Sequence, residues 1–265
     1  MIVERSACAV CKGTKFKTIA DIDSINIVAC LNCGFQFAKK FDTDVIDKHY
    51  QEGYYPSPDA SCMDEWISRN VLAWRSLCCD IASEKLPVNS LLDIGSGTGG
   101  FLMEFHSRFQ GTKLSAVESS RNAREFVRNK IPSIVFLDDV PGSEAFDVIT
   151  CLQTLEHVHE PDILCREIFT ALNPGGLLLL TVPNTACLSH FWKKKEKTLC
   201  YGNPTHLQFF NIVSVESMLR NAGFKKIKRI VKMDRGSGGL PSSLIQYFAR
   251  FAGVSSELRY IAFKN

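Results

Sequence analysis

The sequence predicts an α/β protein, in which helices cover both faces of a mostly parallel sheet and a small cysteine-containing module precedes the sheet. Three observations predict this fold. Short apolar segments typical of strands alternate with helical patterns from residue 90 to residue 182. A glycine-rich loop follows the first of these segments, and two cysteine pairs lie in the first forty residues. Strands that alternate with helices build parallel sheets covered on both faces.

The first element, residues 1–40, is predicted to be a zinc ribbon. Two C-x2-C pairs, separated by 18 residues, have the spacing of a four-thiolate zinc site: Cys8, Cys11, Cys30 and Cys33. Gly13 and Gly34 follow the pairs, where the turn needs a residue that tolerates positive φ. Four unrelated buried cysteines are the weaker interpretation, because forty residues cannot build a stable core unaided. Four thiolates leave no open coordination position, so the zinc is expected to be structural.

Composition narrows the class of protein. The chain has 265 residues, is 45% hydrophobic and carries a formal net charge of only +3, which disfavours a protein that mainly coats nucleic acid. The start of the chain lacks the pattern of a signal peptide, and the longest apolar run, Leu177 to Val182, is too short to span a bilayer. We therefore expect a cytoplasmic protein without stable membrane insertion. The seven cysteines outside the two pairs are expected to be small buried hydrophobes.

Residues 41–86 are predicted to be a linker followed by a helix. Prolines and a glycine between residues 49 and 58 favour extended or turning chain over 41–61. The tyrosines in this stretch could face a pocket or pack over the domain junction. From Met63 to Ile81 apolar residues recur at helical spacing, and Pro87 ends the helix.

Residues 87–265 are predicted to form the main domain. Five buried strands are expected at residues 90–94, 114–118, 134–137, 146–151 and 177–182, with helices near 100–109, 121–129 and 161–172. In such sheets ligands bind beyond the carboxyl ends of the strands. The glycine loop, Glu118, Asp138, Asp139 and the segment after Cys151 all follow strand ends, so we expect them to converge.

The glycine loop contains G-x-G-x-x-G at Gly95, Gly97 and Gly100. Phe101 follows where a Walker loop needs lysine, which excludes that motif. A dinucleotide loop would place pyrophosphate near the carboxylate of Asp93, which is electrostatically unfavourable. A cationic ligand without phosphate, such as S-adenosylmethionine, would instead be attracted, and the glycines would let it approach the backbone.

Carboxylates after the second and third strands suggest an adenosine site. Glu118 can accept both ribose hydroxyls, although NAD carries the same ribose. Asp138 or Asp139 could accept a hydrogen bond from the adenine amino group. The alternative for each is a solvated loop residue or a helix cap, but Ser119 and Ser120 are the more natural caps beside Glu118.

Six parts of the sequence resemble, in order, the motifs of class I S-adenosylmethionine-dependent methyltransferases, especially the ubiquinone-biosynthesis-like O-methyltransferases. These parts are 91–100, Glu118, 146–150, 155–158, 172–177 and 181–184. The resemblance covers residues 88–231 well and the zinc ribbon moderately. It implies a Rossmann-like seven-stranded sheet with an antiparallel last strand, residues 224–233 and 258–263 being the last two strands. It also implies these cofactor-binding residues: Asp93, Gly95, Ser96, Gly97, Glu118, Ser119, Asp138, Asp139 and Gln153.

Two further segments have roles implied by the resemblance. Residues 184–210 would overhang the cofactor as an acceptor lid, because they are too long for a plain connection. Residues 234–257 form an insertion in which 241–251 looks like an amphipathic helix. We expect this helix to pack on the sheet or on a partner in a homodimer.

An oxygen acceptor needs a base to remove its proton, and His157 is the favoured candidate because a neutral imidazole suits pH near 7. His159, His190 and His206 are alternatives, and His157 could instead be hydrogen-bonded to its own loop. The stretch 156–160, Glu-His-Val-His-Glu, also looks like a metal cluster. We discount it because its two histidines would lie on different faces of a helix.

The leading hypothesis is therefore an enzyme that methylates a small-molecule acceptor, such as an O-methyltransferase acting on a sugar, lipid-linked or polyketide-type compound. The alternatives are a zinc-ribbon RNA methyltransferase and a non-catalytic scaffold that retains the cofactor fold. Nucleic acid is disfavoured as a partner by the low net charge. Two basic clusters could contact phosphate or simply be solvated: Lys193, Lys194, Lys195 and Lys197, and Lys225, Lys226, Lys228, Arg229 and Lys232.

Overall fold

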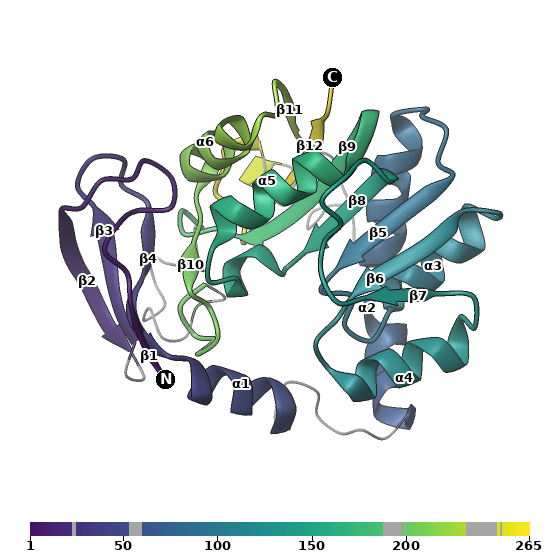
Figure 1. The fold of residues 1–265 in the computed structure, drawn as a ribbon, viewed down its shortest axis with the longest axis horizontal. Coiled ribbons are helices and arrows are strands. Elements are labelled where there is room, and N and C mark those ends of the chain that lie inside the picture. Colours follow the sequence, from purple (N-terminus) through teal and green to yellow (C-terminus); the bar gives the residue numbers. More distant parts are fainter. Residues whose placement is uncertain (23–24, 53–59, 188–197, 199, 232–247, 250) are drawn as a thin grey trace.

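A computed structural model describes residues 1–265 except 23–24, 53–59, 188–197, 199, 232–247 and 250. Its described strands form two sheets, a large one at the centre and a small one at its side (Figure 1). The expected insertion therefore lies largely outside the described residues, as does the part of the expected lid from 188 to 197 with residue 199. His190, the first basic cluster and Lys232 also lie outside them.

The large sheet has seven strands in the order β11-β12-β9-β8-β5-β6-β7. Their bounds are β5 Ser90–Ile94, β6 Lys113–Val117, β7 Val135–Leu137, β8 Phe146–Leu152, β9 Leu172–Pro183, β11 Lys226–Arg229 and β12 Glu257–Phe263. The strands β5 to β9 pair in parallel, whereas β12 runs antiparallel to both β9 and β11. The expected seven-stranded, mostly parallel sheet with an antiparallel last strand is confirmed.

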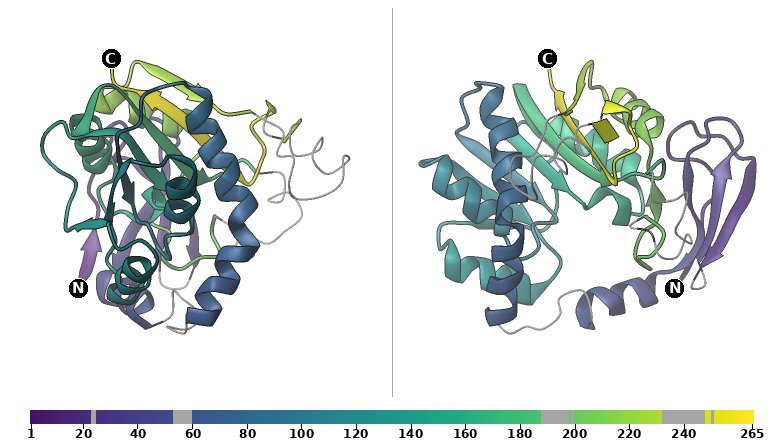
Figure 2. Two further views of the ribbon diagram at one scale, coloured as in Figure 1. Left: turned by 90° about the vertical axis from the view of Figure 1, so that its right-hand side faces the viewer. Right: turned by 180° about the vertical axis from the view of Figure 1, so that it is seen from behind.

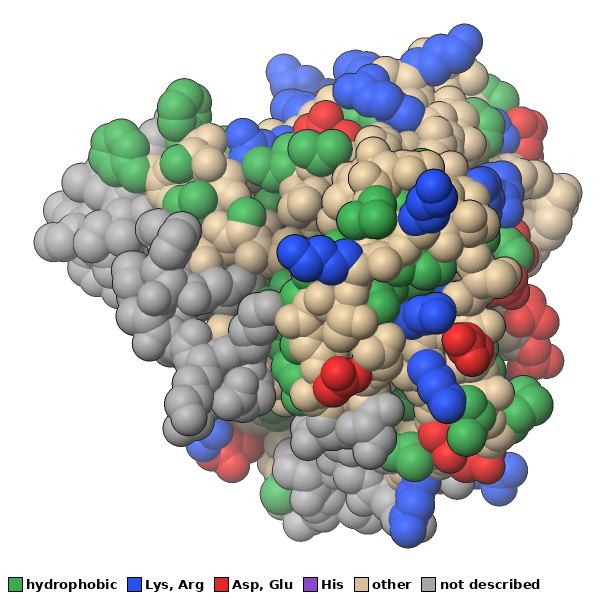
Figure 3. All heavy atoms as spheres, turned by 90° about the vertical axis from the view of Figure 1, so that its left-hand side faces the viewer, with side chains coloured by type: hydrophobic (Ala, Val, Ile, Leu, Met, Phe, Trp, Pro, Cys, Tyr) green, Lys and Arg blue, Asp and Glu red, His purple; other side chains and the backbone are tan. Residues whose placement is uncertain are grey.

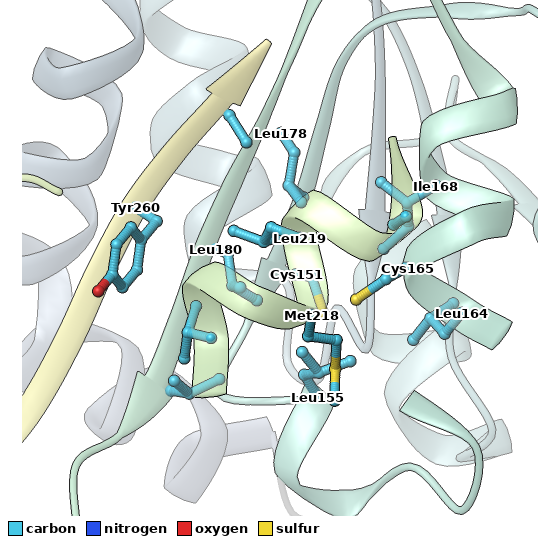
Figure 4. Packing of buried hydrophobic residues seen from close by; sticks show 14 of the residues in the cluster. Cys151, Leu155, Leu164, Cys165, Ile168, Leu178, Leu180, Met218, Leu219 and Tyr260 are labelled. Atoms are coloured by element: carbon cyan, nitrogen blue, oxygen red, sulfur yellow. The ribbon is translucent and has the colours of Figure 1, made fainter. Parts of the chain in front are cut away.

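Helices cover both faces of this sheet because successive strand residues point to opposite sides. Leu91 and Leu179 pack with helices α2 (Ala60–Ser83), α3 (Gly100–Arg108) and α4 (Arg121–Lys130). Leu92 and Leu180 pack with α5 (Pro161–Ala171) and α6 (Ile212–Ala222) on the other face (Figure 4). Among the described residues both faces of the large sheet are thus covered by helices, which leaves the ends of its strands accessible to a ligand.

The long helix α2 is tied to the sheet by a buried ion pair. Arg259 Nη1 on β12 lies 2.8 Å from Asp80 Oδ2, and a second bond joins Nη1 to Ser76 Oγ at 3.0 Å. Both charged side chains are almost fully buried. Figure 2 shows α2 running along its face of the sheet. No helix among the described residues is long and apolar enough to cross a membrane.

The small sheet is made mostly by the first 42 residues. Its antiparallel order is β1-β4-β3-β2, with bounds β1 Ile2–Glu4, β2 Phe16–Ile22, β3 Ile25–Cys30 and β4 Gln36–Asp42. A fifth strand, β10 (Gln208–Phe209), comes from the second half of the chain and pairs with Phe37 and Gln36 of β4. Phe35 and Phe37 also share a hydrophobic core with α5 and α6. The small sheet is therefore packed into the rest of the chain.

The structure corrects the expectation of extended chain over residues 41–61. Residues Thr43–Glu52 form helix α1. Asp44 lies in its first turn, where the negative charge of a carboxylate interacts favourably with the helix dipole. Ile46 anchors this helix against Phe41 and Leu207. The glycine and prolines that suggested extended chain all follow the helix, in residues 53–59, outside the described part. Helix α6, with an Asn211 capping box, was also not predicted.

Candidate functional site

A cavity of about 970 Å³ lies at the carboxyl ends of the parallel strands. Its wall is built from α2, the ends of β5, β6 and β8, the turn after β8, and β12. This volume lies at the upper end of the range for small-molecule sites, so it can hold a cofactor together with a small second ligand. Nine predicted site residues line it: Asp93, Gly95, Ser96, Gly97, Glu118, Ser119, Asp139, Gln153 and His157.

The tenth predicted residue, Asp138, does not line the cavity. Its side chain is 94% exposed, and its Oδ1 accepts a hydrogen bond from Arg124 Nη1 at 3.4 Å. Of the two adjacent aspartates only Asp139 lines the cavity. Successive residues after a strand point in different directions, which the two identical side chains in the sequence could not reveal.

The glycine loop is held in left-handed backbone. Gly95, Gly97 and Gly99 have φ of 71°, 55° and 70°. A Cβ at Gly95 would lie 2.4 Å from Thr154 Oγ1, and one at Gly100 would lie 2.1 Å from the ring of Trp74. The expectation that these glycines only admit a ligand is therefore incomplete, because Gly95 and Gly100 are also required by neighbouring side chains of the protein.

Asp93 is a buried acid at the end of β5. Its Oδ1 accepts a hydrogen bond of 2.7 Å from the hydroxyl of Thr150 on the adjacent strand β8. The pKa of Asp93 is raised to about 7, chiefly by burial and also by the nearby charge of Glu118, while the Thr150 bond opposes the shift. A cation beside Asp93 would offset this loss of solvation and favour the carboxylate form.

Glu118 connects the loop to the next helix. Its Oε2 accepts a bond of 2.7 Å from the backbone N–H of Gly97, and Oε1 accepts one of 2.8 Å from that of Ser120. Ser120 is itself the N-cap of α4 and accepts from the N–H of Ala123. Glu118 is thus no helix cap, and each of its oxygens keeps a lone pair for a ligand donor.

Two hydroxyl groups of the loop are buried without a partner. Ser96 Oγ and Thr98 Oγ1 have no hydrogen bond to any described residue. Ser96 and Thr98 both line the cavity. Because buried polar groups are nearly always hydrogen-bonded in native proteins, these hydroxyls indicate that the loop is shaped to contact a polar ligand.

Gln153 carries backbone strain at the end of β8. Its φ is 51°, which is rare outside glycine, and its backbone N–H donates to Thr181 O at 2.9 Å. Its side-chain Nε2 donates to Glu257 Oε2 at 3.2 Å. Strained residues cluster at functional sites, and this one turns the chain from β8 into the cavity wall.

His157 is held in the cavity wall by Thr205. Its Nδ1 lies 3.1 Å from Thr205 O and 2.9 Å from Thr205 Oγ1. A carbonyl oxygen can only accept, so the proton lies on Nδ1 and Nε2 keeps the lone pair that a base needs. Thr205 lies far along the chain, whereas the contact of His157 Nε2 with Glu156 Oε1, at 3.9 Å, lies within the same turn.

A buried polar cluster lies behind His157. The His206 ring meets the His157 ring edge-on with centroids 4.7 Å apart, and burial lowers the pKa of His206 to about 4. Burial raises the pKa of Glu156 to about 8, and neither of its carboxylate oxygens accepts a hydrogen bond from a described residue, although Oε1 lies 3.9 Å from His157 Nε2. His159 lines the cavity, whereas His206 does not.

Several lining residues were not predicted from sequence. Trp66 and Trp74 lie two turns apart on α2, with ring centroids 5.3 Å apart, and both face the cavity. Their helical spacing is visible in the sequence, but it predicts only that they lie on the buried face of a helix. Glu257 and Arg259 of β12 and Asn203 also line the cavity, and no local motif marks them.

The four N-terminal cysteines converge as predicted. Cys8 Sγ lies 3.6 Å from Cys33 Sγ, and Cys11 Sγ lies 3.5 Å from Cys30 Sγ, with all four sulfurs within 4.8 Å of one another. Tetrahedral zinc with Zn–S bonds of about 2.3 Å separates its sulfurs by roughly 3.8 Å, so the spacing fits. The positive φ values fall on Lys12 and Gly34, and Gly13 is instead needed by the close approach of Asn32.

Comparisons with known proteins agree with this geometry. The family described as "Methyltransferase domain" matches residues 63–229. The mitochondrial ubiquinone biosynthesis O-methyltransferase of Saccharomyces cerevisiae is 31% identical over 143 residues, which cover 49% of this chain and 45% of the relative. That of Xanthomonas campestris (strain B100) is 33% identical over 111 residues, covering 37% and 45%. This chain thus spans less than half the length of these relatives.

Solved structures share the fold. A methyltransferase from Archaeoglobus fulgidus, described as dependent on S-adenosylmethionine, has a TM-score of 0.53 at 15% identity, covering 84% of this chain and all of that chain (100%). An O-methyltransferase family protein from Burkholderia thailandensis has a TM-score of 0.55 at 14% identity, covering 82% and 64%. At such identities the likeness shows the fold alone.

Gly95→Ala tests the packing of the loop. An added methyl would cost about 1 kcal/mol for the left-handed backbone and about 1–3 kcal/mol for its clash with Thr154. Gly111→Ala is the matched control, since Gly111 has φ 85° with nothing within 4 Å of its added Cβ. Urea unfolding should show a larger loss for Gly95→Ala, and Thr154→Ala should recover part of it. Equal losses at the two glycines would contradict the clash.

Proposed function

This chain belongs to the methyltransferase-domain family, and on that premise we propose that it transfers a methyl group from S-adenosylmethionine to an oxygen of a small-molecule acceptor. The observation that carries the proposal is the buried Asp93 beneath the glycine loop. A carboxylate there attracts a cationic ligand and repels the pyrophosphate of a dinucleotide. S-adenosylmethionine carries an ammonium and a sulfonium group and no phosphate.

The residues of the cavity fit this cofactor. Asp93 and the loop from Gly95 to Gly97 would hold the methionyl part, with the unpaired hydroxyl of Ser96 as a further donor or acceptor. Glu118 and Ser119 would hold the ribose, and Asp139 would accept from the adenine amino group. The bound cofactor supplies an activated methyl group, so the protein contributes mainly by positioning.

The acceptor is proposed to be a small molecule because the cavity volume of about 970 Å³ is that of a small-molecule site. The matched relatives are named as ubiquinone biosynthesis O-methyltransferases, which favours an oxygen acceptor. His157 is proposed as the base that removes the acceptor's proton, since it lines the same cavity and the bond from Nδ1 to Thr205 O leaves Nε2 as its acceptor nitrogen.

The RNA alternative has less support. Lys226 lies over the ring of Phe263, 4.2 Å from its centroid, and Lys228 Nζ is bound to Glu84 Oε1 at 2.7 Å. These two members of the second basic cluster are therefore engaged within the protein. Figure 3 views the molecule from the side of the small sheet, where Lys and Arg side chains are spread among acidic and apolar ones. A phosphate-binding face would concentrate its cations.

The proposal is tested by methyl transfer itself. Incubation of the protein with labelled S-adenosylmethionine and fractionated cell extract should label a small molecule, whose structure then gives the acceptor atom. His157→Ala should lower turnover on that acceptor by about 10²–10⁴-fold if His157 is the base. Binding of NAD without binding of S-adenosylmethionine would overturn the cofactor assignment.

Binding of S-adenosylmethionine should depend on pH. The cationic ligand favours ionised Asp93, so binding below pH 7 must release the proton that burial holds on this acid. The affinity should therefore fall as pH drops below about 7, by at most about tenfold per pH unit, and level off above it. Calorimetric titrations between pH 5.5 and pH 8.5 measure this dependence. Asp93→Asn should bind weakly at every pH; an unchanged pH dependence in this variant would assign the proton elsewhere.

We further infer that the four N-terminal cysteines hold a structural zinc ion. Elemental analysis of unchelated protein should find about one zinc per chain, by the four-ligand stoichiometry. Cys30→Ser should lose the metal and lower the melting temperature, because Cys30 lies in the core shared by both sheets. Cys79→Ser, which changes an exposed thiol, is the control. Protein without metal would contradict the inference.

A further inference from the structure

The turn that carries His157 is held from outside by the small sheet. This turn, residues 155–160, joins β8 to α5 and places His157 and His159 in the cavity wall. Three of its carbonyl oxygens accept hydrogen bonds from groups beyond the main domain's sheet. The N–H of Leu207 donates to Glu156 O at 2.8 Å, and Gln208 Nε2 donates to Val158 O at 2.7 Å.

The third bond comes from Arg5, directly after strand β1. Its Nη2 donates to His159 O at 2.5 Å. Its guanidinium also lies over the ring of Phe41, 5.0 Å from the centroid, and the His159 ring packs on the same phenylalanine with centroids 5.1 Å apart. One side chain of the small sheet thus contacts the backbone of the turn, while an aromatic neighbour supports both partners.

Arg5 also orients the amide of Gln208. Its Nη1 donates to Gln208 Oε1 at 3.2 Å and to Leu207 O at 3.4 Å. Because the amide oxygen is taken by the guanidinium, the amide nitrogen must point the other way, toward Val158 O. The two ends of the planar guanidinium therefore control the bonds to two of the three carbonyl oxygens, those of Val158 and His159. Lysine has the charge but not this fork.

Burying the charged guanidinium of Arg5 is energetically unfavourable, which argues that its contacts have a specific role. Partial burial lowers the pKa of Arg5 to about 10, while the charges of Glu160 and Asp162 act in the opposite direction. Arg5 still carries its charge at neutral pH. A charge withdrawn from water is retained only where hydrogen bonds and opposite charges satisfy it, and here they all come from the turn and its surroundings.

We propose that Arg5 is a positioning residue of the active site, which holds the turn 155–160, and with it His157, at the cavity wall through His159 O and Gln208. The small sheet then contributes to the methyl-transfer site by holding this turn in position. The effect of Arg5 on catalysis rests on the proposed function. Its effect on the position of the turn can be measured whether or not the protein is a methyltransferase of this kind.

Hydrogen exchange tests the control of the turn. In Arg5→Lys and Arg5→Ala, amides of residues 155–160 and that of Leu207 should exchange at least tenfold faster, while those inside β8 and α5 keep their wild-type rates. Ethylguanidinium should restore slow exchange in Arg5→Ala, and sodium chloride at the same ionic strength should not. Lys12→Met, which removes the 2.6 Å ion pair to Asp162 elsewhere between the two parts, is the matched control and should leave the turn unchanged.

A second variant covers the case in which Arg5→Ala does not fold. Gln208→Glu keeps the side chain's size and its contact with Arg5 but removes the donor to Val158 O, so it should also speed exchange in the turn. Unchanged exchange of residues 155–160 in the folded variants would overturn the proposal. Faster exchange over the whole small sheet would also overturn it, because Arg5 would then stabilise the sheet in general and not the turn in particular.

Turnover separates positioning from stability. With the acceptor found by the extract screen, Arg5→Lys should lower kcat about tenfold or more, while the Kd of S-adenosylmethionine, measured by calorimetry, stays within about twofold. Equal kcat values for Arg5→Lys and wild type would also overturn the proposal. If wild-type protein does not bind S-adenosylmethionine, the proposed function fails, and the exchange result still decides whether Arg5 holds the turn.

Discussion

The burial of one carboxyl group, Asp93, sets the character of the site. A charge taken out of water at the end of a central strand is tolerated only if its surroundings satisfy it. Here a hydroxyl on the adjacent strand donates to Asp93, but burial still raises its pKa to about 7. The folded protein therefore holds a buried acid whose charged form a nearby cation would stabilise. The left-handed glycine loop and the unpaired hydroxyls around it belong to the same arrangement.

The small sheet is more than an attached module. Strand β10 joins it from the second half of the chain, and its phenylalanines share a core with helices α5 and α6. Arg5, Leu207 and Gln208, none of which lines the cavity, then bind carbonyl oxygens of the turn. The four-cysteine cluster lies in this same sheet, so a metal bound there, as proposed, would stabilise the part of the chain that contacts the turn of His157.

The fold around the cavity also explains why its chemistry is split between distant parts of the chain. Parallel strands bring their carboxyl ends to one edge, so Asp93, Glu118, Asp139 and His157 converge although they are spread over more than sixty residues of sequence. Helix α2 closes the cavity with Trp66 and Trp74 and is fixed by the buried Asp80–Arg259 pair. Positioning of this kind is what a reaction with an activated methyl donor requires.

The sequence by itself determined the parallel sheet, the alternation of its strands and helices from residue 90 to residue 182, the cysteine pairs and nine residues that line the cavity. These are recorded locally, because apolar periodicity and motif spacing act over a few residues. Only the tertiary structure decided that β10 completes the small sheet, that Asp139 rather than Asp138 lines the cavity, and that Thr205 and Arg5 hold the turn of His157. A two-residue strand has no period to detect, and a contact between residues 5 and 159 leaves no local trace, since it depends on how the whole chain packs.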